Sequence, residues 1–214
     1  MDFKKAFQAS IRNVASHGDT DIFPFPFENH LFYDQTHECA ETLELIHANF
    51  EEYMAAYPPN TIVTLSQIGY TGFRWATLIE PFWNAYYLAL VILLADKIEA
   101  QRISEDREEV FSYRFSWDDS GAKLFKDVTW KDYKDRCLNL CKTHKYVVMT
   151  DIADFYSRIN HHRIENFLHR LPSPGDLPNR IMRLLKAFSK TVSLRSTRWW
   201  ASIPYSRGAC PYCC

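Results

Sequence analysis

The feature that most constrains the fold is the apolar run PFWNAYYLALVILLA at residues 81–95. A helix needs about 20 mainly apolar residues to span a bilayer, and this run is shorter and contains Asn84. Pro81 is tolerated in a first helical turn, and apolar side chains recur at helical spacing beyond the run. The sequence therefore predicts a buried helix at about residues 81–102, and no membrane partner is expected.

Composition indicates a globular protein of one domain or one and a half. The 214 residues are 47% hydrophobic and 15% aromatic, enough to bury a substantial core. The six cysteines are unevenly spread and the N-terminal segment lacks the apolar core of a signal peptide, which predicts a reducing cytoplasm. Cys210 and Cys213 have the inner spacing of a zinc knuckle, but no second ligand pair lies at a suitable distance.

Charge is nearly balanced overall but not along the chain. Every charged side chain after Asp176 is basic: Arg180, Arg183, Lys186, Lys190, Arg195, Arg198 and Arg207. Such a bias is compatible with a polyanion partner and equally with a solvated basic helix face. Charge alone does not choose between the two.

Periodicity and turn residues predict further elements. Residues 38–57 have apolar positions at helical spacing, and residues 130–142 are also predicted to be helical. The run TIVTL at 61–65 and the turn at 69–72 predict a hairpin that carries Arg74 near its tip. VFSYRFSW at 110–117 is predicted to be another β stretch, while Arg102, Arg114 and Lys145 are interpreted as surface charges.

The stretch YVVMTDIADFYSRINHHRIENFL at 146–168 combines three patterns. Residues 146–150 suit a central strand, with Asp151 where that strand should end. Asn160 can cap the amphipathic helix that follows. His161 and His162 are adjacent, so on a helix they diverge by about 100° and should face solvent rather than share a metal.

Two interpretations of the acidic turn stay open on spacing alone. Asp151 and Asp154 could cap the turn through local hydrogen bonds to the backbone. Alternatively, Asp151 could bind Mg²⁺, which prefers carboxylate and carbonyl oxygens and shares its other positions with substrate phosphates.

The residues around these carboxylates resemble a known family. DIADFYSRI at 151–159 is similar to motif A of reverse transcriptases. GYTGFRWATLIEPFWNAYYLALVILLADKIEAQR at 69–102 and VFSYRF at 110–115 resemble the fingers region of bacterial reverse transcriptases, particularly the lineages associated with phage defence. The similarity covers about residues 65–171.

The resemblance implies roles for five positions and a set of ligands. Asp151 would be a catalytic, metal-binding aspartate, and the backbone carbonyl of Ile152 a further Mg²⁺ ligand. Asp154 would help to hold the triphosphate mainly through its backbone, and Arg74 would reach the same phosphates. Tyr156 would be the gate that excludes a 2′-hydroxyl, although it could be a core tyrosine. The implied partners are an RNA template, a DNA primer and deoxynucleoside triphosphates.

The sequence departs from the family after motif A. A glycine-rich motif B and a Tyr-x-Asp-Asp hairpin are expected there, and neither is present, so the chain alone should not polymerise. One possible coding sequence for residues 199–209, read from its second base, gives Gly-Gly-His-Pro-Ser-Arg-Ile-Val-Ala-Glu, which resembles motif B. This reading suggests a frameshifted or otherwise truncated gene.

The expected architecture is α/β: an N-terminal extension and a helix-rich fingers-like region over residues 1–145, a partial palm with motif A over 146–192 and an aberrant tail over 193–214. Because the palm sheet would be incomplete, the last forty or so residues are expected to pack loosely. The predicted function is that of a reverse transcriptase fragment. The alternatives are a non-catalytic module that binds nucleic acid or a partner, and a nonfunctional remnant.

Overall fold

The apolar run forms the central helix α5 (Pro81–Glu99). The computed structural model describes residues 2–18, 27–68, 72–117, 123–126, 130–148, 150, 152 and 159–189. The Glu80 carboxylate caps α5 by accepting hydrogen bonds from the backbone N–H groups of Phe82 (3.3 Å) and Trp83 (3.2 Å), and Pro81 occupies the first turn as predicted. Most α5 side chains are buried, and no helix in the described part of the chain is both long and apolar enough to cross a membrane.

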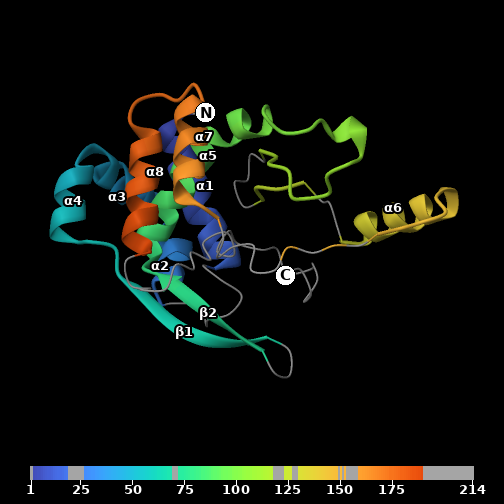
Figure 1. Cartoon of the computed structure of the whole chain (residues 1–214). Coiled ribbons are helices and arrows are strands. Elements are labelled where there is room, and N and C mark those ends of the chain that lie inside the picture. The colour runs from blue at the N-terminus through green and yellow to red at the C-terminus, as the bar shows by residue number, and fades with distance from the viewer. Residues whose placement is uncertain are drawn as a thin grey trace.

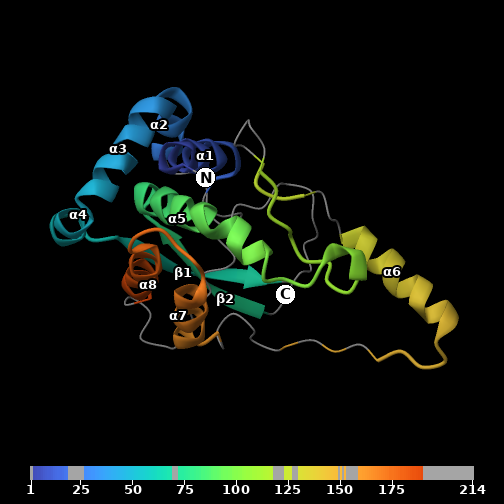
Figure 2. The ribbon, with the colours of Figure 1, turned by 90° about the horizontal axis from the view of Figure 1, so that it is seen from above.

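Four N-terminal helices pack on one side of α5 (Figures 1 and 2). They are α1 (Phe3–His17), α2 (Glu28–Asp34), α3 (Thr36–Ala48) and α4 (Phe50–Ala56). Of these, α1 contacts α2, α3 and α5. The single helix predicted for residues 38–57 is wrong in one respect: Asn49 leaves helical geometry (φ −118°, ψ 39°) and separates α3 from α4.

The predicted hairpin is present and extends below the helices in Figure 1. Strands β1 (Thr61–Ile68) and β2 (Gly72–Ile79) pair antiparallel, with Thr61 opposite Ile79 and Ile68 opposite Gly72. Ala76 and Ile79 are buried, whereas Leu65 and Phe73 are exposed. The fold is thus mixed, as predicted, but mostly helical with a small antiparallel sheet.

The segment that follows α5 does not form the predicted strand at 110–117. It contains a short 3₁₀ turn (Glu105–Arg107) and a single antiparallel bridge between Phe115 and Phe125. The Glu99 carboxylate accepts hydrogen bonds from the Phe115 backbone N–H (3.0 Å) and from the Arg114 guanidinium (3.1 Å). The end of α5, rather than a neighbouring strand, therefore holds this segment.

Helix α6 (Trp130–Thr143) projects from the side of the molecule (Figure 1). The strand predicted for residues 146–150 is wrong for the residues that the structure describes there. Tyr146, Val147 and Val148 lie outside any strand and are 79%, 54% and 85% exposed. A strand exists only when a neighbour completes its hydrogen bonds, and the described part of the chain places no strand beside these residues.

Helices α7 (His161–Arg170) and α8 (Leu177–Phe188) pack against each other, and α8 packs on α5 (Figure 2). The expectation that the last forty or so residues pack loosely is wrong for α8. Its buried side chains are Leu177, Pro178, Ile181, Met182, Leu184, Leu185 and Phe188. They follow a helical repeat and join the main core. The remainder of that stretch, residues 190–214, lies outside the described residues.

Candidate functional site

The structure places the predicted site residues only in part. Asp151, Asp154 and Tyr156 lie outside the described residues, so their predicted roles stay predictions. Ile152 is 65% exposed and lies outside helices and strands. The backbone of Arg74 pairs with Ser66, the third pair from the end of the hairpin, which agrees with its predicted place near the tip.

The C-terminal end of the motif A-like stretch is anchored in the core through α7. The Asn160 side chain caps this helix as predicted, accepting a hydrogen bond from the His162 backbone N–H at 2.9 Å. Leu168 and Leu171 are buried, and the ammonium group of Lys97 on α5 donates a hydrogen bond to the carbonyl of Pro172. The residues just after the candidate site are therefore fixed by burial and by hydrogen bonds.

The N-terminal end of the same stretch is attached to α6, which has weaker contacts. The rings of Phe111 and Tyr133 lie 6.0 Å apart, and Arg136 pairs with Glu108 at 3.2 Å. No side chain described on α6 is buried. The two ends of the candidate site are thus held very differently.

A polar cluster that sequence reasoning missed joins α8 to the N-terminal helices. The Arg180 guanidinium donates hydrogen bonds to the His47 carbonyl (2.6 Å) and to the Tyr86 hydroxyl (3.1 Å). It also lies 4.9 Å from the centre of the Phe50 ring, close enough for a cation–π contact. Arg180 is therefore engaged inside the protein and not presented to a polyanion.

The charge state of His47 follows from its neighbours. Its Nδ1 lies 3.0 Å from the Tyr86 hydroxyl and 3.2 Å from a guanidinium nitrogen of Arg180. Because a guanidinium can only donate, Nδ1 must accept, which places the proton of the neutral ring on Nε2. Burial first, and then the charge of Arg180, lower the pKa of His47 from 6.5 to about 4. Burial also raises the pKa of Tyr86.

The other described cations of α8 also have partners. Arg183 pairs with Glu51 and lies over the Phe50 ring, and Lys186 lies 3.5 Å from the Glu165 carboxylate. These contacts argue against a polyanion site made by Arg180, Arg183 and Lys186. Lys190, Arg195, Arg198 and Arg207 lie outside the described residues.

The interpretation of Arg114 as a surface charge is wrong. Its side chain is 6% exposed and pairs with Glu99, which also accepts a hydrogen bond from Arg102 at 2.6 Å. Burial would raise the pKa of Glu99, but the hydrogen bonds from the Phe115 N–H, Arg102 and Arg114 outweigh it and lower the pKa. The Glu99–Arg102 spacing is visible in the sequence, whereas the Arg114 contact depends on how the loop folds.

Histidines and cysteines give no metal centre among the described residues. His162 faces solvent as predicted and lies 3.5 Å from Glu165. His161 is partly buried, contrary to the prediction, and burial, followed by the charge of Lys186, lowers its pKa. No group of three or more His, Cys, Asp or Glu side chains in the described ranges is placed to hold a metal ion. The Mg²⁺ predicted at Asp151 and the zinc considered at Cys210 and Cys213 fall on or beside residues outside those ranges.

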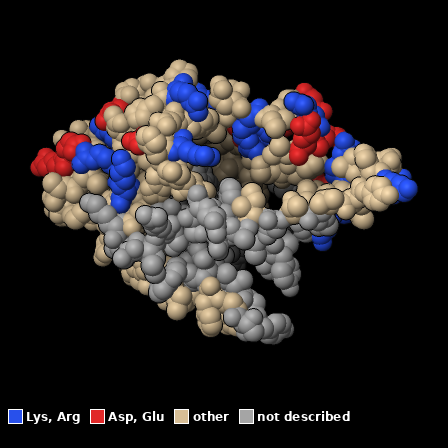
Figure 3. Space-filling view, viewed as in Figure 1, with Lys and Arg blue, Asp and Glu red and all other residues tan. Residues whose placement is uncertain are grey.

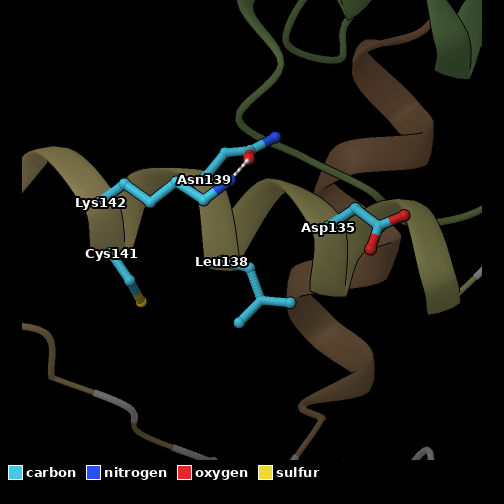
Figure 4. A pocket seen from close by; sticks show the side chains of 5 residues that line it. All are labelled: Asp135, Leu138, Asn139, Cys141 and Lys142. Atoms are coloured by element: carbon cyan, nitrogen blue, oxygen red, sulfur yellow. Dashed lines mark hydrogen bonds between the residues drawn. The ribbon is translucent and has the colours of Figure 1, made fainter.

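One surface hollow lies along α6 (Figure 4). Its lining side chains are Asp135, Leu138, Asn139, Cys141 and Lys142, and the ammonium group of Lys142 donates a hydrogen bond to the Asn139 side chain at 3.1 Å. All of these residues come from one helix, so a ligand there would remain open to solvent. This hollow does not make a substrate site.

Comparison of the chain with known protein families, with curated proteins and with solved structures found no match.

Proposed function

We propose that the chain is part of a reverse transcriptase whose chemistry is RNA-templated DNA synthesis by two-metal nucleotidyl transfer. The observation that carries the proposal is the sequence DIADFYSRI at 151–159, preceded by an apolar run and followed by a capped amphipathic helix. In the proposed architecture residues 1–145 are an N-terminal extension and fingers, and residues 146–192 are the first part of a palm. A hairpin that carries Arg74 and leads into a buried helix supports this assignment.

The proposed roles follow the chemistry of each side chain. The Asp151 carboxylate and the Ile152 carbonyl are the hard oxygen donors that suit Mg²⁺, and Arg74 has a guanidinium that can grip phosphate oxygens with two hydrogen bonds. Tyr156 would crowd a ribose 2′-hydroxyl, and the backbone at Asp154 would help to hold the triphosphate. When bound, Mg²⁺ neutralises the charge that builds up on the transferred phosphoryl group.

The donor set in this chain fits Mg²⁺ but does not complete a two-metal site. One carboxylate and one carbonyl leave the second ion without protein ligands, and the 214 residues contain no Tyr-x-Asp-Asp sequence. We therefore propose that these residues position nucleotide and metal only together with the missing carboxylates. One of the coding sequences open to residues 199–209 reads in its second frame like motif B, and we propose on this ground that the coding region continues in another frame.

The first experiment is to sequence the locus and express the chain with the second reading frame restored. Primer extension on an RNA template is then compared between the restored protein and the 214-residue chain. Activity in the restored protein alone supports the proposal. If no Tyr-x-Asp-Asp codons are found downstream, the frameshift hypothesis is refuted. If neither protein extends a primer, a binding module without catalysis is favoured.

The second experiment separates metal binding at Asp151 from turn capping. In the restored protein, Asp151→Asn keeps the size and local hydrogen bonding of the side chain but removes the charge that the metal needs. Extension should fall by several orders of magnitude with little change in Tm. Asp154→Asn is the matched control and should have a milder effect, because its proposed role is mainly in the backbone. Small, equal effects from both would refute the assignment.

A further inference from the structure

Helix α7 has two faces of opposite character. Ile164, Phe167 and Leu168 pack against the core, with Leu168 5% exposed. The opposite face is exposed and entirely polar, and its side chains are His162, Arg163, Asn166, His169 and Arg170. Because no apolar side chain is exposed on this face, it does not suit a hydrophobic protein partner.

Arg163 and Arg170 lie on the same side of that face. Seven residues make almost two full helical turns, which places the two Cα atoms on the same side of the helix at a rise of about 10 Å. Asn166 lies between them, three residues from one arginine and four from the other. We call these three residues the α7 row. Its three side chains all carry N–H donors.

The α7 row differs from the other cations nearby in having no internal partner. Within the part of the chain that the structure describes, the Arg163 and Arg170 side chains have neither a hydrogen bond nor an ion pair, whereas Arg180, Arg183 and Lys186 each have one. Figure 3 shows blue side chains exposed over α7 and α8, while red ones gather at the α4 end and, on the other side of the molecule, over the segment that follows α5.

The acidic side chains that could neutralise the row are few. From the start of α7 to the end of α8, residues 161–188, the chain has five Lys or Arg residues and two acidic ones, Glu165 and Asp176. Glu165 lies beside Lys186 and His162, and Asp176 accepts a hydrogen bond from the Asn179 side chain. The positive charge of the row is therefore left for solvent or for an external anion.

We propose that the α7 row binds the phosphate backbone of a single-stranded nucleic acid. Guanidiniums bind phosphate oxygens with two hydrogen bonds, and an Asn amide donates to the same oxygens without reading the base. The proposal rests on the proposed function in one respect: α7 directly follows the motif A-like stretch, so the row would hold nucleic acid next to that site. Binding should be independent of base sequence, because only phosphates are contacted.

The test uses the full chain and two double variants that lose the same charge. Arg163→Gln with Arg170→Gln removes the arginines of the row. The control, Arg107→Gln with Lys131→Gln, removes two exposed cations elsewhere. Affinity for short unstructured RNA and DNA oligonucleotides is measured by fluorescence anisotropy over a series of salt concentrations, and circular dichroism checks that all variants are folded.

The row variant should bind both oligonucleotides roughly tenfold more weakly at low salt, because it loses two charge-assisted phosphate contacts. Its plot of log affinity against log salt should be shallower by about 1.4, since each single-strand phosphate contact contributes roughly 0.7 to the slope. The control should stay near the native affinity. If the row variant loses affinity for RNA but not for DNA, or the reverse, the α7 row binds only the nucleic acid whose affinity falls.

Three results would overturn the inference: native protein that binds neither oligonucleotide, equal losses in both double variants, or displacement of RNA by polyglutamate as effective as displacement by unlabelled RNA. The last would show an unselective polyanion surface. Primer extension by the restored protein is a separate measurement. If extension fails while the row variant still loses binding, the proposed function is wrong and the nucleic-acid face stands.

Discussion

Helices α6 and α8 have similar lengths and both mix apolar with charged residues, yet they behave differently in the fold. Helix α8 buries its apolar stripe against α5 and α7, whereas α6 leaves Leu138 and Leu140 60% and 41% exposed. An amphipathic pattern indicates that a helix has a face to bury, but the rest of the chain decides whether anything covers it.

The comparison is tested most strongly by the same substitution in each helix. Leu184→Ala on α8 removes a fully buried side chain and should lower the free energy of unfolding by about 2–5 kcal/mol. Leu138→Ala on α6 should change it by no more than about 0.5 kcal/mol, because that side chain is already largely in water. Urea denaturation measures both. Equal losses would mean that α6 is packed in solution.

The second test concerns the polar cluster that ties α8 to the N-terminal helices. Arg180→Met keeps packing over Phe50 but removes the donors to the His47 carbonyl and the Tyr86 hydroxyl. Leaving partly buried acceptors without a partner should cost about 1–3 kcal/mol. Arg183→Met is the matched control: it also replaces a guanidinium over Phe50 by an apolar side chain, but the ion pair that it breaks, with Glu51, is exposed, so it should lower Tm less. The reverse order would show that the cluster contributes little.

The sequence correctly predicts those elements that are specified by a few adjacent residues. The Pro81 helix start, the Asn160 cap and the hairpin around residue 70 each depend on a few adjacent residues, and the structure contains all three. The apolar stripe of α8 is equally local, but the prediction of loose packing depends on an incomplete palm sheet and takes no account of this stripe.

The elements that were missed depend on distant partners. A strand at 146–150 needs neighbours that the described chain does not supply, and the burial of Arg114 requires the loop to return to Glu99. His47, Tyr86 and Arg180 come from three separate helices, so no spacing reveals their contact. For the candidate site, the sequence correctly predicted the Asn160-capped helix after the motif but not the structure before it, while Asp151, Asp154 and Tyr156 lie outside the described residues.

Acid should destabilise the packing of α8 on the N-terminal helices through protonation of His47. Its pKa in the folded protein is about 4, below its ordinary value of 6.5, so the unfolded chain takes up the proton first. The free energy of unfolding should therefore fall as the pH drops from 6.5 towards 4 and receive no further change from this group below that range. His47→Gln should flatten this part of the Tm profile. If the Tm profile of His47→Gln were identical to that of the native protein, the imidazole of His47 would be exposed to water in the folded state.

The smallest expected effect concerns the Asn160 cap of α7, the helix that lies between α6 and α8 in the chain. Asn160→Ala removes the side-chain oxygen that accepts from the His162 N–H, and should lower the free energy of unfolding by about 1 kcal/mol. Asp176→Ala is the matched control, since Asp176 is at the start of α8 but makes no capping hydrogen bond there. Its loss should be smaller, because α8 is held by burial rather than by its cap. Hydrogen exchange should also show faster opening of the first turn of α7 in Asn160→Ala, while the amides of α8 keep their native protection. Faster exchange spread evenly over both helices would mean that α7 and α8 open together, and that the cap stabilises the pair rather than the helix start.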